Sequence, residues 1–292
     1  MTPWGATVAK VSFRSAAAQA QHAARSLDLD SARTEKNYEQ ALKGVAEYLK
    51  ENRLGDLRSL DKEKAEQYLE IRSQEVGQKT LDLDRQAMQA VIGEKLAVVK
   101  SELQTTLESR AYTSEQAAMV ASAQSEKHSL ATQIAENAGL RAHELLTLRP
   151  VEERAADTHR EYRDDRFTGR ENVAIYTVEG KGGLCREVAI DKALADRLEE
   201  RRLDEPRTVF DREVRYEQHY DIGGGQNWSN SFSAASNREL GWSTGAHGLR
   251  HEFAQERMNT LQEHGYEYRE ALEIVSQEMG HFRPDITEVY LR

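Results

Sequence analysis

The C-terminal part of the chain carries side chains that suit chemistry on a phosphate group. The segment His247-Gly-Leu-Arg250 is followed by Gly280-His281, and Tyr290 lies nine positions after that histidine. A tyrosine hydroxyl can attack phosphorus, a planar guanidinium matches two phosphate oxygens at once, and imidazole exchanges protons near neutral pH. These residue types therefore supply the nucleophile, the cation and the proton carrier that side-chain attack on a phosphodiester requires.

An earlier segment adds a second arginine of the same kind. In Gly139-Leu-Arg141-Ala-His-Glu144 the arginine lies among leucines, which predicts that a packed segment holds it in place. The acid follows three residues later, a spacing that one helical turn brings beside the arginine. Glu144 is therefore expected to orient a guanidinium or a neighbouring backbone donor.

A lysine lies between two alternating apolar arms. The glycine-rich segment Glu179-Gly-Lys181-Gly-Gly183 is typical of the turn of a β-hairpin. Lysine is rare in this part of the chain, because residues 111–292 contain three lysines against twenty arginines. Lys181 is therefore a candidate proton donor, since an amine in a mobile turn can reach a leaving oxygen.

Taken in order, these segments resemble the catalytic signature of the tyrosine recombinases, the phage and mobile-element integrases. The specific part of the resemblance covers residues 139–149, 179–187 and 247–290. It implies an enzyme that breaks and rejoins double-stranded DNA at specific sites, for integration or excision of a mobile element, through a 3′-phosphotyrosine intermediate. It further implies a homotetramer on DNA, allows for a DNA-bending accessory protein, and requires no cofactor, neither ATP nor metal.

The resemblance also implies a role for each candidate. The expected catalytic residues are Arg141, Lys181, His247, Arg250, His281 and Tyr290. The tyrosine attacks the phosphate, the two arginines grip it, and the lysine protonates the leaving 5′ oxygen. The two histidines bind the phosphate or relay the tyrosine proton, and Glu144 is a supporting residue.

Each of these residues, taken alone, has a plainer interpretation as a surface charge, a turn residue or a packed aromatic ring. Three other functions also stay open. The first is a non-cleaving, architectural DNA-binding protein on the same fold. The second is a related strand-cleaving enzyme, such as a type IB topoisomerase or a telomere resolvase. The third is a metal-dependent hydrolase that uses His247 and His251, four residues apart on one helical face, with Glu252 adjacent.

The charge balance runs against a nucleic-acid partner. The chain has 50 acidic residues against 40 basic ones, a formal net charge of -10. Residues 1–110 contain 17 residues of each sign, so the whole deficit lies in residues 111–292. A local basic surface can still bind DNA, because phosphate contacts are screened beyond roughly 10 Å at 0.1 M salt.

Cysteine usage and hydropathy give an expectation for the compartment. The single cysteine, Cys185, cannot form an internal disulfide, and no apolar run is long enough to span a bilayer. We therefore expect a cytoplasmic protein without membrane contact. The resemblance to the integrases further implies a bacterial or phage-encoded protein that is associated with the nucleoid.

The elements that would position these residues fall into two groups. Residues 1–30 predict a flexible or marginally helical leader, because they show no firm periodicity beyond their Ala and Gln richness. Apolar spacings of three and four predict a helix from Ala32, a second after Asp61 and a third from Thr80. Residues 31–110 are therefore an expected all-helical domain, which resembles the DNA-binding, core-binding domain of the integrases.

The second group, residues 111–292, is the expected catalytic domain of mixed α+β type. Its predicted elements are helices over 114–123, 128–137 and 192–202 and a β-hairpin over 172–190. Residues 211–242, rich in Gly, Ser and Asn, predict a long loop, and Pro284 predicts the first turn of a short helix that carries Tyr290. The fold class is thus mainly α with a small antiparallel hairpin or sheet.

Overall fold

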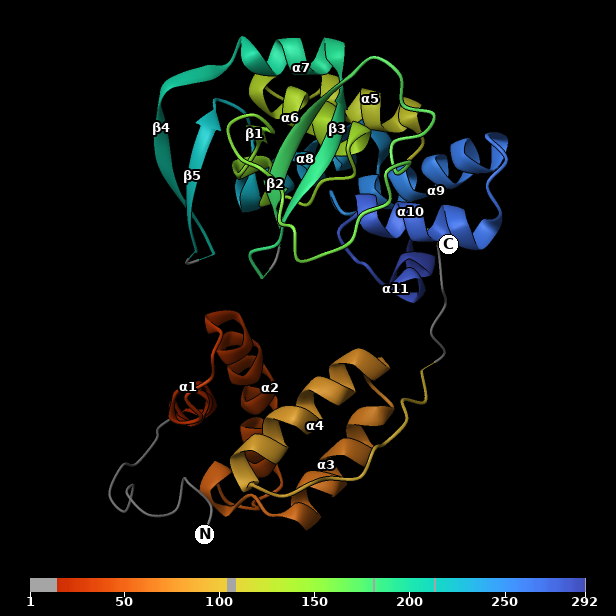
Figure 1. Ribbon diagram of the computed structural model, residues 1–292. Coiled ribbons are helices and arrows are strands. Elements are labelled where there is room, and N and C mark those ends of the chain that lie inside the picture. Colours follow the sequence, from red (N-terminus) through yellow and green to blue (C-terminus); the bar gives the residue numbers. More distant parts are fainter. Residues whose placement is uncertain (1–14, 104–108, 181, 213, 292) are drawn as a thin grey trace. The chain divides into compact units, whose positions relative to one another are not determined.

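The computed structural model describes residues 15–103, 109–180, 182–212 and 214–291. Figure 1 shows that this described chain is mostly helical and has small antiparallel sheets. It divides into two compact units, Met1–Thr106 and Leu107–Arg292, which we call the N-terminal unit and the C-terminal unit. Among the described helices, none combines the length and the apolar character needed to cross a membrane.

The N-terminal unit packs its described helices around a core of leucine, alanine and valine side chains. The helices are α1 (Ala16–Ser26), α2 (Ala32–Glu51), α3 (Lys62–Ser73) and α4 (Gln78–Ile92), with a 3-10 turn η1 (Leu57–Ser59). The predicted helices from Ala32 and after Asp61 are confirmed, and the side chain of Asp61 caps α3. Helix α4 begins two residues before the predicted Thr80, because Gly77 takes the N-cap position.

The predicted leader over residues 1–30 is described from residue 15 onward, and most of that part forms helix α1 rather than flexible chain. The side chain of Ser15 accepts a bond from the backbone of Ala18, which starts α1. Three alanines of α1 are fully buried in the core shared with α2, namely Ala20, Ala23 and Ala24. Alanine contributes little to an apolar pattern, so only the packing against α2 reveals this helix. The first 14 residues lie outside the described chain.

In the C-terminal unit, helices surround a three-stranded antiparallel sheet (Figure 1). The described helices are α5 (Ser114–Ser122), α6 (Glu126–Asn137), α7 (Lys192–Glu199), α8 (Gly225–Leu240), α9 (Gly248–Glu263), α10 (Tyr268–Glu278) and α11 (Pro284–Glu288), with 3-10 turns η2 (Glu144–Leu146) and η3 (Val289–Leu291). The strands are β1 (Arg149–Pro150), β2 (Val173–Glu179), β3 (Cys185–Asp191), β4 (Arg202–Asp211) and β5 (Val214–Tyr220). The strand order is β1-β2-β3 in one sheet and β4-β5 in the other.

The hairpin predicted over residues 172–190 is confirmed as β2 and β3. The two strands pair without a register shift, from Val173 opposite Asp191 to Glu179 opposite Cys185. The glycine-rich segment is therefore the turn that joins them. Buried side chains of both strands join the main core of this unit, which also receives α5, α6, α7 and α8. The hairpin is thus anchored at its base, and its turn lies at the far end.

The long loop predicted over residues 211–242 is wrong, because the segment forms β5 and α8. Three apolar residues of α8 point into the core at helical spacing, namely Trp228, Phe232 and Ala235. The Ser and Asn residues between them mask this pattern in the sequence. Strand β5 alternates buried Gln218 and Tyr220 with more exposed neighbours, so its strand character depends on pairing with β4.

A separate small core holds the C-terminal tail. Side chains of α9 and α10 pack together, and Tyr290 of η3 is part of the same cluster. Figure 1 shows α9, α10 and α11 grouped at one end of the C-terminal unit. Pro284 is the first residue of α11, as predicted. This packing brings the last residues of the chain against the helix that carries His247 and Arg250 at its start.

Candidate active site

The segment after α6 holds Arg141 through a buried carboxylate. Gly139 ends the helix with a positive φ of +60°, and the chain then turns sharply into η2. Glu144 accepts a hydrogen bond from the backbone N–H of Arg141 at 2.8 Å and one from its Nη1 at 2.7 Å. The carboxylate is fully buried, whereas the guanidinium is partly exposed. The predicted orienting contact of Glu144 with a guanidinium is therefore present.

A third arginine, Arg186, completes this network and was not predicted. It lies on β3, is 1% exposed, and donates to both oxygens of Glu144 at 2.8 and 3.0 Å. Its Nε donates to the backbone carbonyl of Glu278 at 3.0 Å. The sequence held a signal, since Arg186 lies two residues before Val188 and therefore on the same face of β3 as the buried Val188 and Ile190. An arginine at an inward strand position needs a buried partner.

The two arginines decide the protonation of Glu144. Burial alone would raise the pKa of this carboxyl, but the positive charges of Arg186 and Arg141 outweigh that effect and hold its pKa well below the usual range. The carboxylate is thus ionised at neutral pH. Glu144, Arg141 and Arg186 form one buried ion network, which links η2, β3 and the end of α10.

Arg250 is the most enclosed of the candidate residues, with no exposed surface. Its guanidinium donates to the backbone carbonyls of Gly139 and of Met279, the latter at 3.2 Å, and lies 3.1 Å from Nε2 of His281. Burial, and then the positive charge of Arg141, lower the pKa of Arg250 to about 9, which leaves it cationic at neutral pH. The segments that carry Arg141, Arg250 and His281 therefore meet around the side chain of Arg250.

The turn after α10 places His281. Gly280 has a positive φ of +71°, and the next backbone N–H, that of His281, donates to the carbonyl of Ser276 at 2.8 Å. The ring then bridges Arg250 and the hydroxyl of Thr287, whose Oγ1 is 3.0 Å from Nδ1. Burial, and then the charges of Arg250 and Arg141, lower the pKa of His281 to about 3. The imidazole is thus neutral at neutral pH.

Tyr290 lies over these groups and faces His247. Its ring is 9% exposed, and its hydroxyl is 3.0 Å from Nε2 of His247. The ring centroid is 5.0 Å from that of His281, and the Arg250 guanidinium lies 5.5 Å from it. His247 as a whole residue is exposed, but burial of the imidazole among its neighbours, and then the charge of Arg250, lower its pKa to about 4. A neutral imidazole therefore faces the tyrosine hydroxyl.

Lys181 lies outside the described residues, so the structure does not place its side chain. Its neighbours are described: the N–H of Gly180 donates to the carbonyl of Leu184 at 2.7 Å, and Gly182 and Gly183 both have positive φ. A Cβ added at Gly180 would lie 3.6 Å from Oε1 of Glu144. The start of the turn is thus beside the buried ion network.

His251, which the metal-site hypothesis pairs with His247, packs its ring against Tyr290 with a centroid distance of 4.7 Å. The two histidine rings are 5.9 Å apart and nearly perpendicular. Within the described ranges, no group of three or more His, Cys, Asp or Glu side chains is arranged to hold a metal ion. The described residues therefore supply no third ligand for the proposed metal site at His247 and His251.

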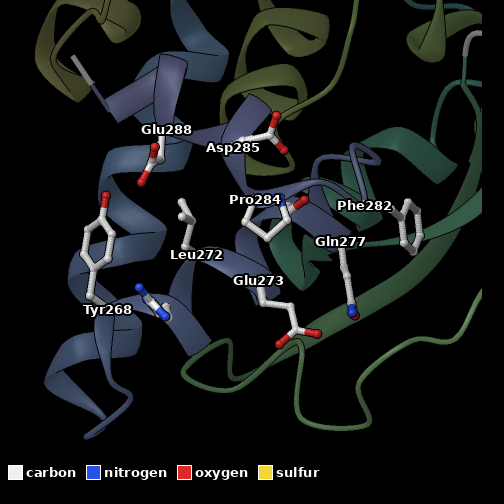
Figure 2. A pocket seen from close by; sticks show the side chains of 10 residues that line it. Tyr268, Leu272, Glu273, Gln277, Phe282, Pro284, Asp285 and Glu288 are labelled. Atoms are coloured by element: carbon white, nitrogen blue, oxygen red, sulfur yellow. The ribbon is translucent and has the colours of Figure 1, made fainter.

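A pocket of about 610 Å³ lies between α10 and α11 (Figure 2). Figure 2 shows apolar Leu272, Phe282 and Pro284 facing it together with acidic Glu273 and Glu288. None of the described candidate catalytic residues lines this pocket. The candidate site is instead the partly exposed group of side chains around Tyr290.

Gly139 offers a direct test of how tightly the site is built. Besides its positive φ, a Cβ there would lie 2.4 Å from the ring of Phe253. We expect Gly139→Ala to lower the free energy of unfolding by about 2–4 kcal/mol, combining the strained backbone with a clash against an aromatic ring. Urea unfolding of the full chain measures this loss. The matched control is Gly265→Ala, which has φ of +89° but nothing within 4 Å, and equal losses in both variants would contradict the expected clash.

Comparisons by sequence find no relative, since neither a protein-family model nor a curated protein matches this chain. Solved structures do resemble it. The XerH site-specific recombinase bound to palindromic difH substrate, in a post-cleavage complex, matches with a TM-score of 0.62 and 15% identity, covering 94% of this chain and 81% of that chain. The pre-cleavage complex of XerH with difH substrate matches with a TM-score of 0.58 and 16% identity over the same shares.

The XerA recombinase is a third match, with a TM-score of 0.41 and 12% identity over 95% of this chain and 92% of that chain. The two XerH matches show that this chain has a fold similar to that of a site-specific recombinase. The mainly helical architecture with small antiparallel sheets agrees with this likeness.

Proposed function

We propose that this protein is a site-specific DNA recombinase of the integrase type, which cleaves and rejoins DNA strands for a mobile element. The observation that carries the proposal is the grouping of a tyrosine hydroxyl, two neutral imidazoles and two arginines contributed by four separate segments of the chain. The tyrosine hydroxyl is 3.0 Å from a base, His247 Nε2, and its ring lies beside the Arg250 guanidinium. This is the geometry that nucleophilic catalysis requires of a nucleophile and its base.

In the proposed cleavage step, Oη of Tyr290 forms a bond to phosphorus while the bond from phosphorus to the 5′ oxygen breaks. The tyrosine proton passes to Nε2 of His247, which its lowered pKa leaves unprotonated at neutral pH. Lys181 donates a proton to the departing 5′ oxygen. The product is a 3′-phosphotyrosine and a free 5′ hydroxyl. Rejoining is the reverse attack by a 5′ hydroxyl, so the proposed cycle consumes neither ATP nor a metal ion.

Arg141 and Arg250 are proposed to hold the non-bridging oxygens of the phosphate. A guanidinium keeps its charge at working pH and presents two parallel donors, which suits the charge that develops in the transition state. Glu144 holds the first of these arginines, and His281 contacts the second at 3.1 Å. We propose that His281, which stays neutral, donates a hydrogen bond to a phosphate oxygen rather than carrying a charge.

The two units are proposed to bind opposite faces of a duplex, with residues 31–110 as the core-binding part and residues 111–292 as the cutting part. Four protomers on two DNA sites would then exchange strands in two rounds. The support for double-stranded DNA as the substrate is the fold similarity to XerH, whose solved complexes contain its difH substrate. Because the net charge of the chain is -10, the surfaces that contact DNA must be local patches of basic residues.

Covalent trapping tests this proposal. The protein is incubated with sheared DNA that contains the element, denatured, and the DNA that stays attached is sequenced. Adducts at one recurrent sequence support a site-specific recombinase. Adducts without a recurrent sequence, together with relaxation of supercoiled DNA, would support the topoisomerase alternative instead. DNA binding with no adduct would support the architectural alternative.

A sulfur substitution tests the proposed acid. We expect Lys181→Ala to slow cleavage of ordinary DNA by about 10²–10⁴-fold, the range of general acid catalysis. DNA with a 5′-bridging sulfur at the cut site should restore most of the rate, because a thiolate leaves without protonation. Single-turnover cleavage of both substrates by the wild-type protein is the control. A variant that stays equally slow on both substrates would exclude Lys181 as the acid.

A further inference from the structure

The β4–β5 hairpin exposes large apolar side chains at its far end. Phe210 on β4 is 72% exposed and Val214 on β5 is 49% exposed. The strands stay paired up to Asp211 opposite Val214, so these side chains are carried on a regular two-stranded ribbon. Paired residues share a face of the ribbon, so Phe210 and Val214 lie on opposite faces. The largely exposed ring of Phe210 is therefore a candidate contact for another molecule.

Arginines accompany the exposed ring. Arg215 lies directly opposite Phe210, so the two side chains are on the same face of the ribbon. Arg215 donates to the hydroxyl of Thr208 at 3.4 Å, and Arg212, in the turn, donates to the amide oxygen of Gln226. Both acceptors are neutral, so the two guanidinium charges are available to an anionic partner.

Two described acids close to Phe210 and Arg215 have partners outside the ribbon. The carboxylate of Asp211 accepts from the backbone N–H of Gln226 at 2.7 Å, which caps the start of α8. Glu217 pairs with Arg149 at 2.7 Å. The face that carries Phe210 therefore combines an aromatic ring with arginine and has its described carboxylates turned to other partners.

The far end of this ribbon lies beside the segment that carries Arg141. Gly225, next to the residue that Asp211 caps, donates to the carbonyl of Ala142 at 2.7 Å. The ring of Tyr216 on β5 lies 6.2 Å from that of His143. In Figure 1 the turns of the β2–β3 and β4–β5 hairpins extend to the same edge of the C-terminal unit. The exposed ring is thus held close to the proposed phosphate-binding group.

We propose that the β4–β5 hairpin is a DNA-contacting ribbon, in which Phe210 packs against bases or sugars beside the cleaved phosphate and Arg212 and Arg215 bind the backbone. A two-stranded ribbon fits the major groove, and exposed apolar side chains insert between or pack on bases. The inference rests on the proposed function and extends it, because it assigns a DNA contact to a segment outside the catalytic group. It also gives a reason for an aromatic ring that no neighbouring side chain covers.

Photo-crosslinking from position 210 tests the assignment. Phe210 is replaced by p-benzoylphenylalanine in the full chain, which is mixed with sheared duplex DNA at low salt and irradiated. We expect a crosslink to DNA from position 210 and none from a matched control at Tyr268, an exposed residue of α10 with 45% exposure. A crosslink from position 210 to a second copy of the chain would overturn the assignment and make the hairpin a protein interface.

Affinity measurements separate this inference from the function on which it rests. We expect Phe210→Ala to weaken DNA binding about tenfold, within the range of a lost base–aromatic contact, and Tyr268→Ala to leave it unchanged. Since Phe210 is exposed, the variant should keep the wild-type melting temperature. Wild-type affinity in Phe210→Ala, with no crosslink from position 210, would overturn the hairpin assignment alone. A wild-type protein that binds no DNA would overturn the proposed function as well.

Discussion

Tyr290→Phe abolishes covalent attachment to DNA and leaves DNA binding intact, according to the proposed mechanism. The phenylalanine ring can keep the packing against His251 and His281, since these contacts involve the ring and not the hydroxyl. The lost hydrogen bond to His247 should lower the free energy of unfolding by only about 1 kcal/mol. Loss of the nucleophile, in contrast, leaves no route to a phosphotyrosine. Adducts resolved on a denaturing gel with end-labelled DNA measure the effect.

The matched control is Tyr266→Phe in the same unit. The hydroxyl of Tyr266 donates to Asp165 at 2.9 Å, so this variant also loses one tyrosine hydrogen bond. We expect it to form adducts at the wild-type rate. Adducts formed by Tyr290→Phe at a rate near that of the control would remove Tyr290 as the nucleophile, whatever the stability of either variant.

The largest expected effect on stability comes from Glu144→Gln. The substitution removes the charge that compensates Arg186, a fully enclosed guanidinium, and that orients Arg141. Breaking a buried ion pair by removing one partner lowers the free energy of unfolding by about 3–5 kcal/mol. The corresponding fall in melting temperature is about 2–4 °C per kcal/mol for a unit of this size. Cleavage should also fall, because Arg141 loses the carboxylate that holds it.

Glu179→Gln is the control for this second prediction. Glu179 also pairs with an arginine, Arg154, at 2.7 Å, but its side chain is 49% exposed, so its loss should lower the free energy of unfolding by at most about 1 kcal/mol. Equal losses in the two variants, measured by urea unfolding, would contradict the importance of the buried network.

The same network predicts a pH dependence. The pKa of Glu144 is lower in the folded state than in the unfolded chain, so its contribution to stability is complete above the unfolded pKa of about 4.3. The contribution is lost as the pH falls through the lowered folded pKa. The difference in unfolding free energy between wild type and Glu144→Gln should therefore shrink below about pH 4. A difference that stays constant down to pH 3 would argue against a charged Glu144.

The elements that sequence patterns predicted well are those whose signal is local. The helix from Ala32 presents leucine and valine at regular spacing, Asp61 caps the next helix, and the glycine-rich segment at 179–183 is flanked by alternating arms. In each case the side chains that define the element are close in sequence. Their structure could therefore be predicted without knowledge of the packing.

The elements that were missed depend on tertiary contacts. Helix α1 buries alanines whose apolar signal is weak, and β5 forms only through its pairing with β4. Arg186 was overlooked because its partners, Glu144 and the carbonyl of Glu278, lie 42 and 92 residues away in the chain. Such contacts become visible only when the fold brings distant segments together.

In the candidate site, too, contacts between residues close in sequence could be predicted, whereas contacts between distant segments could not. The spacing of Arg141 and Glu144 predicted their contact, because three residues separate them. The two histidines could not be told apart by sequence, since each follows from a motif and both suit a phosphate or a tyrosine. In the structure His247 faces the hydroxyl of Tyr290, whereas His281 contacts Arg250. This assignment makes His247 the proposed base and His281 the proposed phosphate contact.

The most direct measurement of the central claim is the identity of the residue that carries DNA. Adducts formed with a DNA substrate are denatured and digested with nuclease and trypsin, and the modified peptide is sequenced by mass spectrometry. Trypsin does not cut between Arg283 and Pro284, so the C-terminal peptide spans residues 270–292 and contains Tyr290 as its only tyrosine. We expect a 3′-linked nucleotide phosphate on Tyr290. The same modification on another side chain, or bound DNA that yields no modified peptide, would contradict it.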